Sequence, residues 1–243
     1  MSTELARDEP AALPTTDGCE VEMAGACLRL LPQGALYWPA ERTLIVADLH
    51  LEKASAFAAR RQVFLPPYDS AATLAALTGL CGNLAPGRVI ALGDSFHDAA
   101  APARLAARDA AVIASLQRGR EWIWIAGNHD PAPPDGLGGE WASEVAIDGL
   151  TFRHEPVAGA GAGEIAGHLH PAARVRVKGR TIRRRCFTTD GNRLIVPAFG
   201  AFTGGLNVLD SAFAGLFAVS FRAWLLGEAR LYPIARRKLL PDA

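Results

Sequence analysis

The residues of this chain that are best suited to chemistry are its histidines, because each lies in a short segment shared with carboxylate, amide or glycine residues. The sequence contains six histidines, and these segments hold all of them. In chain order the segments are Asp48-x-His50, Gly93-Asp94-x-x-His97-Asp98, Gly127-Asn128-His129-Asp130, His154-Glu155 and Gly167-His168-x-His170. Imidazole and carboxylate groups together bind divalent transition metals. The pattern predicts a metal centre, with Asp94 as the carboxylate that bridges two ions.

A centre with two ions indicates phosphoester hydrolysis. Two ions about 3.5 to 4 Å apart clamp the attacking and leaving oxygens of a phosphoryl displacement and lower the pKa of a bridging water. We expect the resulting metal-bridging hydroxide to attack phosphorus directly. Mixed oxygen and imidazole ligands suit Mn²⁺ or Fe²⁺, and Zn²⁺ and Co²⁺ stay as alternatives.

Backbone alternation predicts which of these side chains act together. In extended backbone, residues i and i+2 point to one side, so Asp48 and His50 can share an ion, and His168 and His170 can reach neighbouring positions. Adjacent residues point apart. The amide oxygen of Asn128 can therefore bind metal while the next residue, a histidine, faces the substrate.

Each of these residues also has a purely structural interpretation. Asp48 and Asp94 could cap helices, Asn128 could form a turn, and His154 could be a hydrogen-bonded strand histidine. A His-x-His pair alone is a weak signal. The occurrence of all the segments in one chain favours the metal centre, because each structural interpretation would have to hold separately.

The predicted strands bring these segments to one edge of a sheet. Apolar runs typical of buried strands lie at 43–47, 88–92 and 121–125. Helices are expected at 52–61, from Asp69 or Ser70, as a cap, to Leu80, and from Pro102 to Leu116. Strand and helix alternation implies parallel pairing, and ligands of such sheets bind at the carboxyl ends of the strands. Asp48, Asp94 and Asn128 each follow such a strand.

The remaining sequence predicts a flexible start and a second sheet. Residues 1–18 lack a periodic apolar pattern and are expected to form a flexible lead-in to a single domain, residues 19–243. Short strands are expected at 19–31, 35–38, 144–147, 150–153, 164–166, 173–177, 180–187, 193–196, 216–225 and 229–234. Those from residue 142 onward should form a largely antiparallel or mixed sheet packed on the first, with helices outside.

Composition favours a soluble cytoplasmic protein. Half of the 243 residues are apolar, and 25 basic residues balance 25 acidic ones, so charge alone demands neither a nucleic acid nor a membrane. Early acidic residues do not suit a signal peptide, and no apolar run approaches the ~18 residues of a membrane span. The four cysteines form no C-x-x-C pair and are expected to be reduced thiols.

The ordered segments resemble the calcineurin-like metallophosphoesterase superfamily. This resemblance implies a four-layer αββα sandwich, in which helices flank two mixed β-sheets, with a dinuclear site. The implied ligands are Asp48, His50, Asp94 and His170 for one metal, and Asp94, Asn128, His154 and His168 for the other. The resemblance makes His129 the group that stabilises the transition state or protonates the leaving oxygen.

Longer matches resemble one branch of that superfamily. The Gly-Asp-x-x-His segment is similar to the nuclease branch that includes SbcD, in which the histidine matching His97 assists at the phosphate. Residues 48–53, 65–68, 93–98, 152–156 and 197–205 resemble the ligase-associated metallophosphoesterases, or PdeM family. That family implies a manganese-dependent DNA phosphodiesterase or endonuclease in DNA repair. It also implies a pathway shared with an ATP-dependent DNA ligase, an Lhr-type helicase and an exonuclease.

A basic stretch follows the last histidines and could hold a phosphate backbone. It contains Arg174, Arg176, Lys178, Arg180, Arg183, Arg184 and Arg185 and no acid. Alternation along 174–180 would place those side chains on one face, and the alternative is a solvated hairpin. The candidate substrate contacts are Lys53, Tyr68, Arg153, Arg183, Arg184 and Arg185, with Tyr68 as a base-stacking residue or a packing residue.

These observations together predict a two-metal phosphodiesterase that acts on DNA, most simply as an endonuclease on single-stranded or irregular strands. A small-molecule phosphodiesterase or phosphomonoesterase is the first alternative, because the same metal core serves both. A scaffold that kept the fold and lost the chemistry is the second. The complete ligand set and the retained His129 favour an enzyme.

Overall fold

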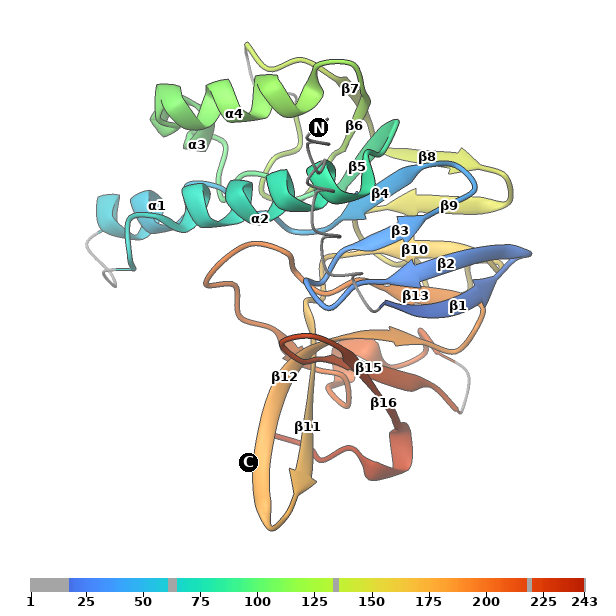
Figure 1. Ribbon diagram of the computed structural model, residues 1–243. Helices are drawn as coiled ribbons and strands as arrows, with labels where there is room; N and C mark the ends of the chain where they lie inside the picture. Colours follow the sequence, from blue (N-terminus) through green and yellow to red (C-terminus); the bar gives the residue numbers. More distant parts are fainter. Residues whose placement is uncertain (1–17, 61–64, 133–135, 218–219, 243) are drawn as a thin grey trace, which may run out of the picture.

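The computed structural model describes residues 18–60, 65–132, 136–217 and 220–242. Within these ranges two β-sheets lie face to face, and α-helices cover the outer face of the first sheet (Figure 1). The predicted lead-in of residues 1–18 lies outside the described residues, apart from Gly18. No helix in the described ranges has the length and apolar character that a membrane crossing requires.

The first sheet combines an antiparallel and a parallel half. Its strands are β1 (Cys19–Met23), β2 (Ala26–Leu30), β3 (Leu36–Trp38), β4 (Thr43–Val46), β5 (Arg88–Leu92), β6 (Glu121–Ile125) and β7 (Glu140–Ala142), in that spatial order. The predicted parallel pairing of β4, β5 and β6 is confirmed. The expected single strand at 19–31 is wrong, because Ala24 and Gly25 both have positive φ and turn the chain into a hairpin.

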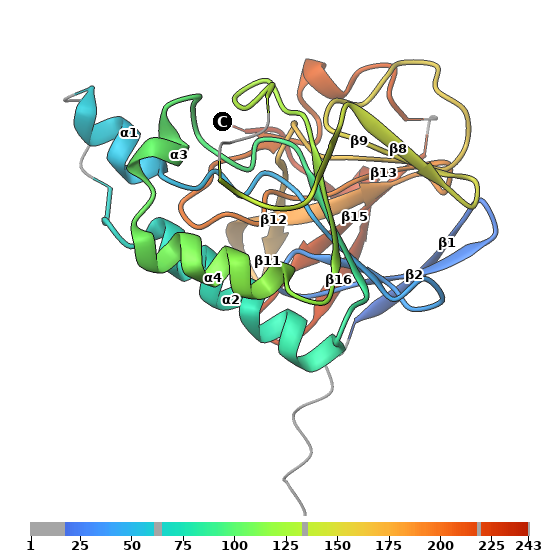
Figure 2. The same cartoon turned by 90° about the horizontal axis from the view of Figure 1, so that it is seen from above.

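The helices differ from the predicted ones at their ends. They are α1 (Lys53–Ala59), α2 (Asp69–Leu84), α3 (Ala101–Arg104) and α4 (Ala107–Gln117), and α2 lies alongside α4 (Figure 2). The single helix expected at 102–116 is broken, because Leu105 and Ala106 adopt extended backbone. Neither Asp69 nor Ser70 caps α2. They accept hydrogen bonds from the backbone N–H groups of Ala54 and Glu52 instead, which fixes α2 against the start of α1.

The second sheet is mixed, as predicted. Its strands are β8 (Glu144–Ile147), β9 (Leu150–Arg153), β10 (Glu164–Ala166), β11 (Pro171–Val177), β12 (Arg180–Thr189), β13 (Arg193–Ile195), β14 (Leu206–Asn207), β15 (Arg222–Leu226) and β16 (Leu231–Ala235). The strand expected at 216–225 begins only at Arg222. Among the described residues, the outer face carries loops and two short 3-10 helices, η1 (Ser211–Phe213) and η2 (Arg236–Lys238).

Apolar side chains between the sheets hold the sandwich together. Ile45, Ile90 and Ile123 of the first sheet pack in one cluster with Phe152 and Phe187 of the second. Such burial is the main stabilising contribution to folding. A parallel bridge between Ala47 and Ala198 then joins the two sheets just beyond the end of β4. This packing places loops of the second sheet against the carboxyl ends of β4, β5 and β6, and confirms the predicted α/β sandwich.

Candidate metal centre

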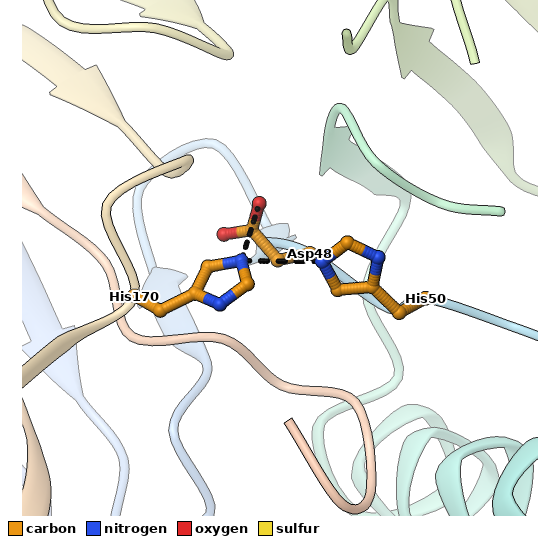
Figure 3. A group of neighbouring side chains, drawn as sticks. All are labelled: Asp48, His50 and His170. Carbon is orange, nitrogen blue, oxygen red and sulfur yellow. Dashed lines mark hydrogen bonds and ion pairs between the residues drawn. The ribbon is translucent and has the colours of Figure 1, made fainter. Parts of the chain in front are cut away.

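One group of ligand-type side chains consists of Asp48, His50 and His170, which we call the first cluster. Nε2 of His170 lies 3.3 Å from Oδ1 of Asp48 and 3.2 Å from Nε2 of His50. Figure 3 shows both imidazoles turned toward the carboxylate from different sides. Asp48 and His50 are buried and His170 is half-buried. Three donor atoms from two sheets therefore converge on one point.

A second cluster consists of Asp94, His154 and His168. Nε2 of His154 lies 3.4 Å from Oδ1 of Asp94 and 3.1 Å from Nδ1 of His168. The same nitrogen lies 2.9 Å from the amide oxygen of Asn128. The structure thus brings together the four side chains that the resemblance placed on one metal.

Asp94 lies between the two clusters. Its Oδ2 is 3.9 Å from Nε2 of His50 in the first cluster, while its Oδ1 faces His154 in the second. Asp48 also approaches the second cluster, with Oδ1 at 3.7 Å from Nδ1 of His154. This is the arrangement that a carboxylate bridging two ions requires.

The donor set fits divalent cations. In two places a pair of ring nitrogens faces each other beside a buried carboxylate: His50 with His170, and His154 with His168. A cation between the donors satisfies all of them, whereas one proton satisfies only a pair. Nδ1 of His154 lies 2.8 Å from the Leu92 carbonyl, and a proton held there leaves Nε2 available as a ligand.

The protonation of these groups follows from burial and charge. Burial, followed by the charge of His170, lowers the pKa of His50 to about 2, so its imidazole is neutral. Burial alone would raise the pKa of Asp94, but the hydrogen bond and charge of His154 lower it to about 2. Burial opposes protonation of His154 as well, yet the carboxylates of Asp94 and Asp48 raise its pKa to about 9. Without a cation, the proton on His154 neutralises part of the acidic charge.

Left-handed backbone places several of the candidate ligands. Asp48, His50, Asp94, His168 and His170 have φ of 53°, 44°, 46°, 67° and 44°. The expectation that extended backbone aligns the pairs 48/50 and 168/170 is therefore wrong. Such conformations cost energy in residues other than glycine and cluster at functional sites. The folded sheets hold these tight turns in place and aim their side chains inward.

Two glycines leave the space that the clusters need. A Cβ atom on Gly127 would overlap the backbone nitrogen of Asp94, and one on Gly167 would lie 2.7 Å from Oδ2 of Asp48. Neither position has room for a side chain. The glycines of the Gly-Asn-His-Asp and Gly-His-x-His segments are therefore steric requirements of the site.

His129 and His97 lie at the open side of the centre. The ring of His129 is 39% exposed, and its Nε2 lies 3.9 Å from Oδ2 of Asp94. Its Nδ1 lies 2.8 Å from the His97 carbonyl, which orients the ring, and its backbone N–H donates to Oδ1 of Asp94. The two imidazoles stack with centroids 5.3 Å apart. Both rings can therefore meet a phosphate group at the centre.

Three of the candidate substrate contacts, Lys53, Tyr68 and Arg153, lie outside the basic stretch of residues 174–185. Lys53 begins α1, and its Nζ lies 6.0 Å from the ring centroid of Phe57, which stacks on His97. Tyr68 is exposed, and its ring meets that of Phe202, in the loop at 198–205, with centroids 5.8 Å apart. Arg153 lies 2.8 Å from Glu144 and 3.3 Å from Glu164, so its charge is neutralised within the second sheet.

The hairpin of β11 and β12 carries the basic stretch. Arg174 lies opposite Arg183, and Val177 lies opposite Arg180. Arg174 and Arg183 therefore share a face, while Arg180 lies on the other. The expectation that all cations of 174–180 lie on one face is wrong, because the chain reverses at Lys178-Gly179. Arg183 and Arg185 donate to the carbonyls of Gly205 and Ala198, whereas Arg184 is exposed.

Two residues at the centre were not predicted as site residues. Asp130 is buried, its Oδ2 accepts the Phe96 N–H at 3.1 Å, and burial raises its pKa to about 7. Phe57 stacks on His97 with centroids 5.5 Å apart. Asp130 belongs to the Gly-Asn-His-Asp segment, which was the available signal. For Phe57 the signal was its position four residues after Lys53, on the same helix face.

Comparisons with known proteins agree with this geometry. Residues 41–195 match the family described as calcineurin-like phosphoesterase. The chain is similar to the Pseudomonas putida nuclease MPE, with 29% identity, a TM-score of 0.69, and coverage of 90% of this chain and 100% of that chain. It is also similar to Yfce, a phosphoesterase from E. coli, with 13% identity, a TM-score of 0.40, and coverage of 79% and 98%. A search of curated proteins finds no match.

The matched segment spans more than half of the chain and contains both clusters. The likeness to the P. putida nuclease extends over nearly the whole molecule. This protein belongs to the calcineurin-like phosphoesterase family and is a metal-dependent phosphoesterase.

Proposed function

We propose that this protein hydrolyses phosphodiester bonds of DNA with two divalent ions, for which Mn²⁺ is the best candidate. The observation that carries the proposal is the meeting of the two clusters at Asp94, because neighbouring ions suit in-line displacement at phosphorus. Mixed oxygen and imidazole donors suit Mn²⁺. Similarity to the P. putida nuclease supports a nucleic acid as the substrate.

The ligand residues in this proposal are Asp48, His50 and His170 for one ion, and Asn128, His154 and His168 for the other, with Asp94 shared. When bound, the ions supply positive charge to the phosphate and lower the pKa of an attacking water. The chain must then orient the phosphate and manage the leaving group.

His129 is the residue we assign to the leaving group. The hydrogen bond from Nδ1 to the His97 carbonyl holds the ring, so that Nε2 faces the centre. In the protonated imidazole, Nε2 can give its proton to the departing oxygen. The stacked ring of His97 can donate to a phosphate oxygen from the same side.

The finer assignment is an endonuclease of the PdeM type. It rests on the sequence resemblance described above and on the similarity to a nuclease. The proposal includes a shared pathway with an ATP-dependent DNA ligase, an Lhr-type helicase and an exonuclease. Localisation in the cytoplasm is part of the same proposal.

The test compares two substrates with the purified protein and Mn²⁺: bis(p-nitrophenyl) phosphate and a circular single-stranded DNA. A circle has no ends, so its cleavage requires endonuclease action. We expect hydrolysis of both, with DNA cleavage lost in His129→Ala. Hydrolysis of the small diester alone would replace the DNA assignment by a small-phosphoester enzyme. Inactivity on both substrates with metal bound would indicate the scaffold.

A further inference from the structure

A buried ion pair joins two neighbouring strands of the second sheet. Glu164 and Arg193 are the first residues of β10 and β13, which lie side by side in parallel (Figure 1). The two residues are 2% and 4% exposed, and the Nε–H group of Arg193 donates to Oε2 of Glu164. Taking two charges out of water is costly, and an apolar pair of similar volume is often as stable. Stability alone therefore does not explain why an ion pair lies here.

The pair holds the backbone of Val157 at both of its polar groups. The Val157 N–H donates to Oε1 of Glu164 at 2.9 Å, and the Val157 carbonyl accepts from Nη2 of Arg193. The same carbonyl accepts the Ala160 N–H at 3.1 Å, within the loop between β9 and β10. Val157 itself is 47% exposed, so apolar packing contributes little to its position. Hydrogen bonds to the ion pair therefore hold this loop against β10 and β13.

The loop and the strand that the pair joins lead to the two histidines of the second cluster. His154 lies three residues before Val157, and His168 lies four residues after Glu164. Strand β9 holds the chain just before His154, and the ion pair holds it just after. The two imidazoles meet at 3.1 Å, from Nε2 of His154 to Nδ1 of His168, so a shift of either segment changes the space for an ion. Metal ligands depend on such outer hydrogen bonds for their orientation.

We propose that Arg193 and Glu164 are positioning residues for the second cluster, because they fix the loop after one histidine ligand against the strand before the other. Arg193 also donates to the Leu216 carbonyl, so its guanidinium meets three acceptors at once. Its planar fork of N–H donors suits this arrangement, which the ammonium group of a lysine does not reproduce. The first cluster should depend on the pair less, because Asp48 and His50 follow β4 of the first sheet. This inference rests on the two ions of the proposed function.

The test measures the affinity for Mn²⁺ by isothermal titration calorimetry of EDTA-treated protein, in two backgrounds that each leave one cluster intact. His170→Ala leaves the second cluster, and His168→Ala leaves the first. Adding Arg193→Lys to His170→Ala should raise the dissociation constant about 10- to 100-fold, because the charge is kept while the fork to Val157 is lost. Adding Arg193→Lys to His168→Ala should leave the dissociation constant nearly unchanged.

A double variant and a matched control complete the set. Glu164→Leu combined with Arg193→Met removes both charges together, so neither is left buried without its partner. It also removes the hydrogen bonds to Val157 and should weaken the second cluster by a similar factor. Arg88→Lys is the control, because Arg88 and Glu121 begin the neighbouring parallel strands β5 and β6 and pair at 2.7 Å, at the strand ends opposite the metal centre. It should leave the affinity of both clusters unchanged.

The outcomes separate this inference from the proposed function. Circular dichroism first establishes that each variant is folded. Equal effects of Arg193→Lys in the two backgrounds, or no effect in either, would overturn the inference while the proposed function stands. Full affinity of the second cluster in the double variant would overturn it as well. A wild type that binds fewer than two Mn²⁺ ions would overturn both.

Discussion

Asp94 is the residue on which the two clusters depend, because its oxygens face histidines of different clusters. It is buried, and its neighbours keep it ionised despite that burial. The histidines around it differ in exposure, and their expected roles differ accordingly. Buried imidazoles hold cations, whereas the partly exposed ring of His129 meets the substrate.

At the residue scale, His129→Ala tests the leaving-group role. We expect kcat on DNA to fall by roughly 10²- to 10⁴-fold, the contribution of a positioned acid, while metal content is retained. The loss on bis(p-nitrophenyl) phosphate should be much smaller, because p-nitrophenolate leaves without a proton. Metal content is measured by elemental analysis. Equal losses on both substrates would assign His129 to phosphate binding instead.

The cysteines offer a second prediction at this scale. Cys186 is fully buried, and burial raises the pKa of its thiol to about 12. Cys27 is exposed. We expect iodoacetamide to label Cys27 in the native protein and Cys186 only after unfolding, because the thiolate is the reactive form. Peptide mass spectrometry distinguishes the two, and native labelling of Cys186 would contradict the packing described for β12.

At the scale of elements, the centre is built by the turns that follow β4, β5 and β6 and by the loops of the second sheet. The turns after β4 and β5 are tight enough to require left-handed φ at Asp48, His50 and Asp94. They are also packed directly on one another, since the His50 N–H donates to the Asp94 carbonyl at 2.9 Å. Glycine at the contact points is what permits this proximity.

Gly127→Ala is the prediction for these turns. The new methyl group would overlap the Asp94 backbone, and overpacking of this kind costs about 1–3 kcal/mol. We expect a lower midpoint of urea unfolding together with lost activity. Gly82→Ala in α2 is the control, because its Cβ meets nothing within 4 Å and should stabilise the helix by about 0.5–1 kcal/mol. An unchanged midpoint in Gly127→Ala would contradict the close contact.

At the scale of the whole molecule, the centre connects the two sheets. Asp48, His50 and Asp94 follow strands of the first sheet, whereas His154, His168 and His170 follow strands of the second. A cation bound to either cluster would therefore tie one sheet to the other. Binding to the native state alone stabilises it by mass action.

Metal should accordingly raise the melting temperature. At 100 times the dissociation constant, each Mn²⁺ would add about 2.7 kcal/mol to the free energy of unfolding. Calorimetry with EDTA or with increasing Mn²⁺ measures the shift. Asp94→Asn removes the shared charge and should weaken the shift markedly, while Asp148→Asn, in the turn between β8 and β9, should retain it. A melting temperature independent of metal would contradict a cation between the sheets.

The sequence by itself determined the strands that carry the site. Continuous apolar runs and the alternation with helices indicate β4, β5 and β6 as parallel, and Asp48, Asp94 and Asn128 follow them at the edge where ligands bind. These properties depend on the periodicity of neighbouring residues. The residue types in these segments are also a local property, and they limit the metal ligands to carboxylate, amide and imidazole groups.

Only the tertiary structure decided how the two halves of the site meet. Packing of one sheet on the other brings His154, His168 and His170 against Asp48 and Asp94, and it supports the left-handed turns that isolated segments would avoid. The same packing neutralises Arg153 in the second sheet and brings the loop at 198–205 against the backbone of Asp48 and His170. Contacts between residues distant in sequence depend on the whole core, so local patterns do not encode them.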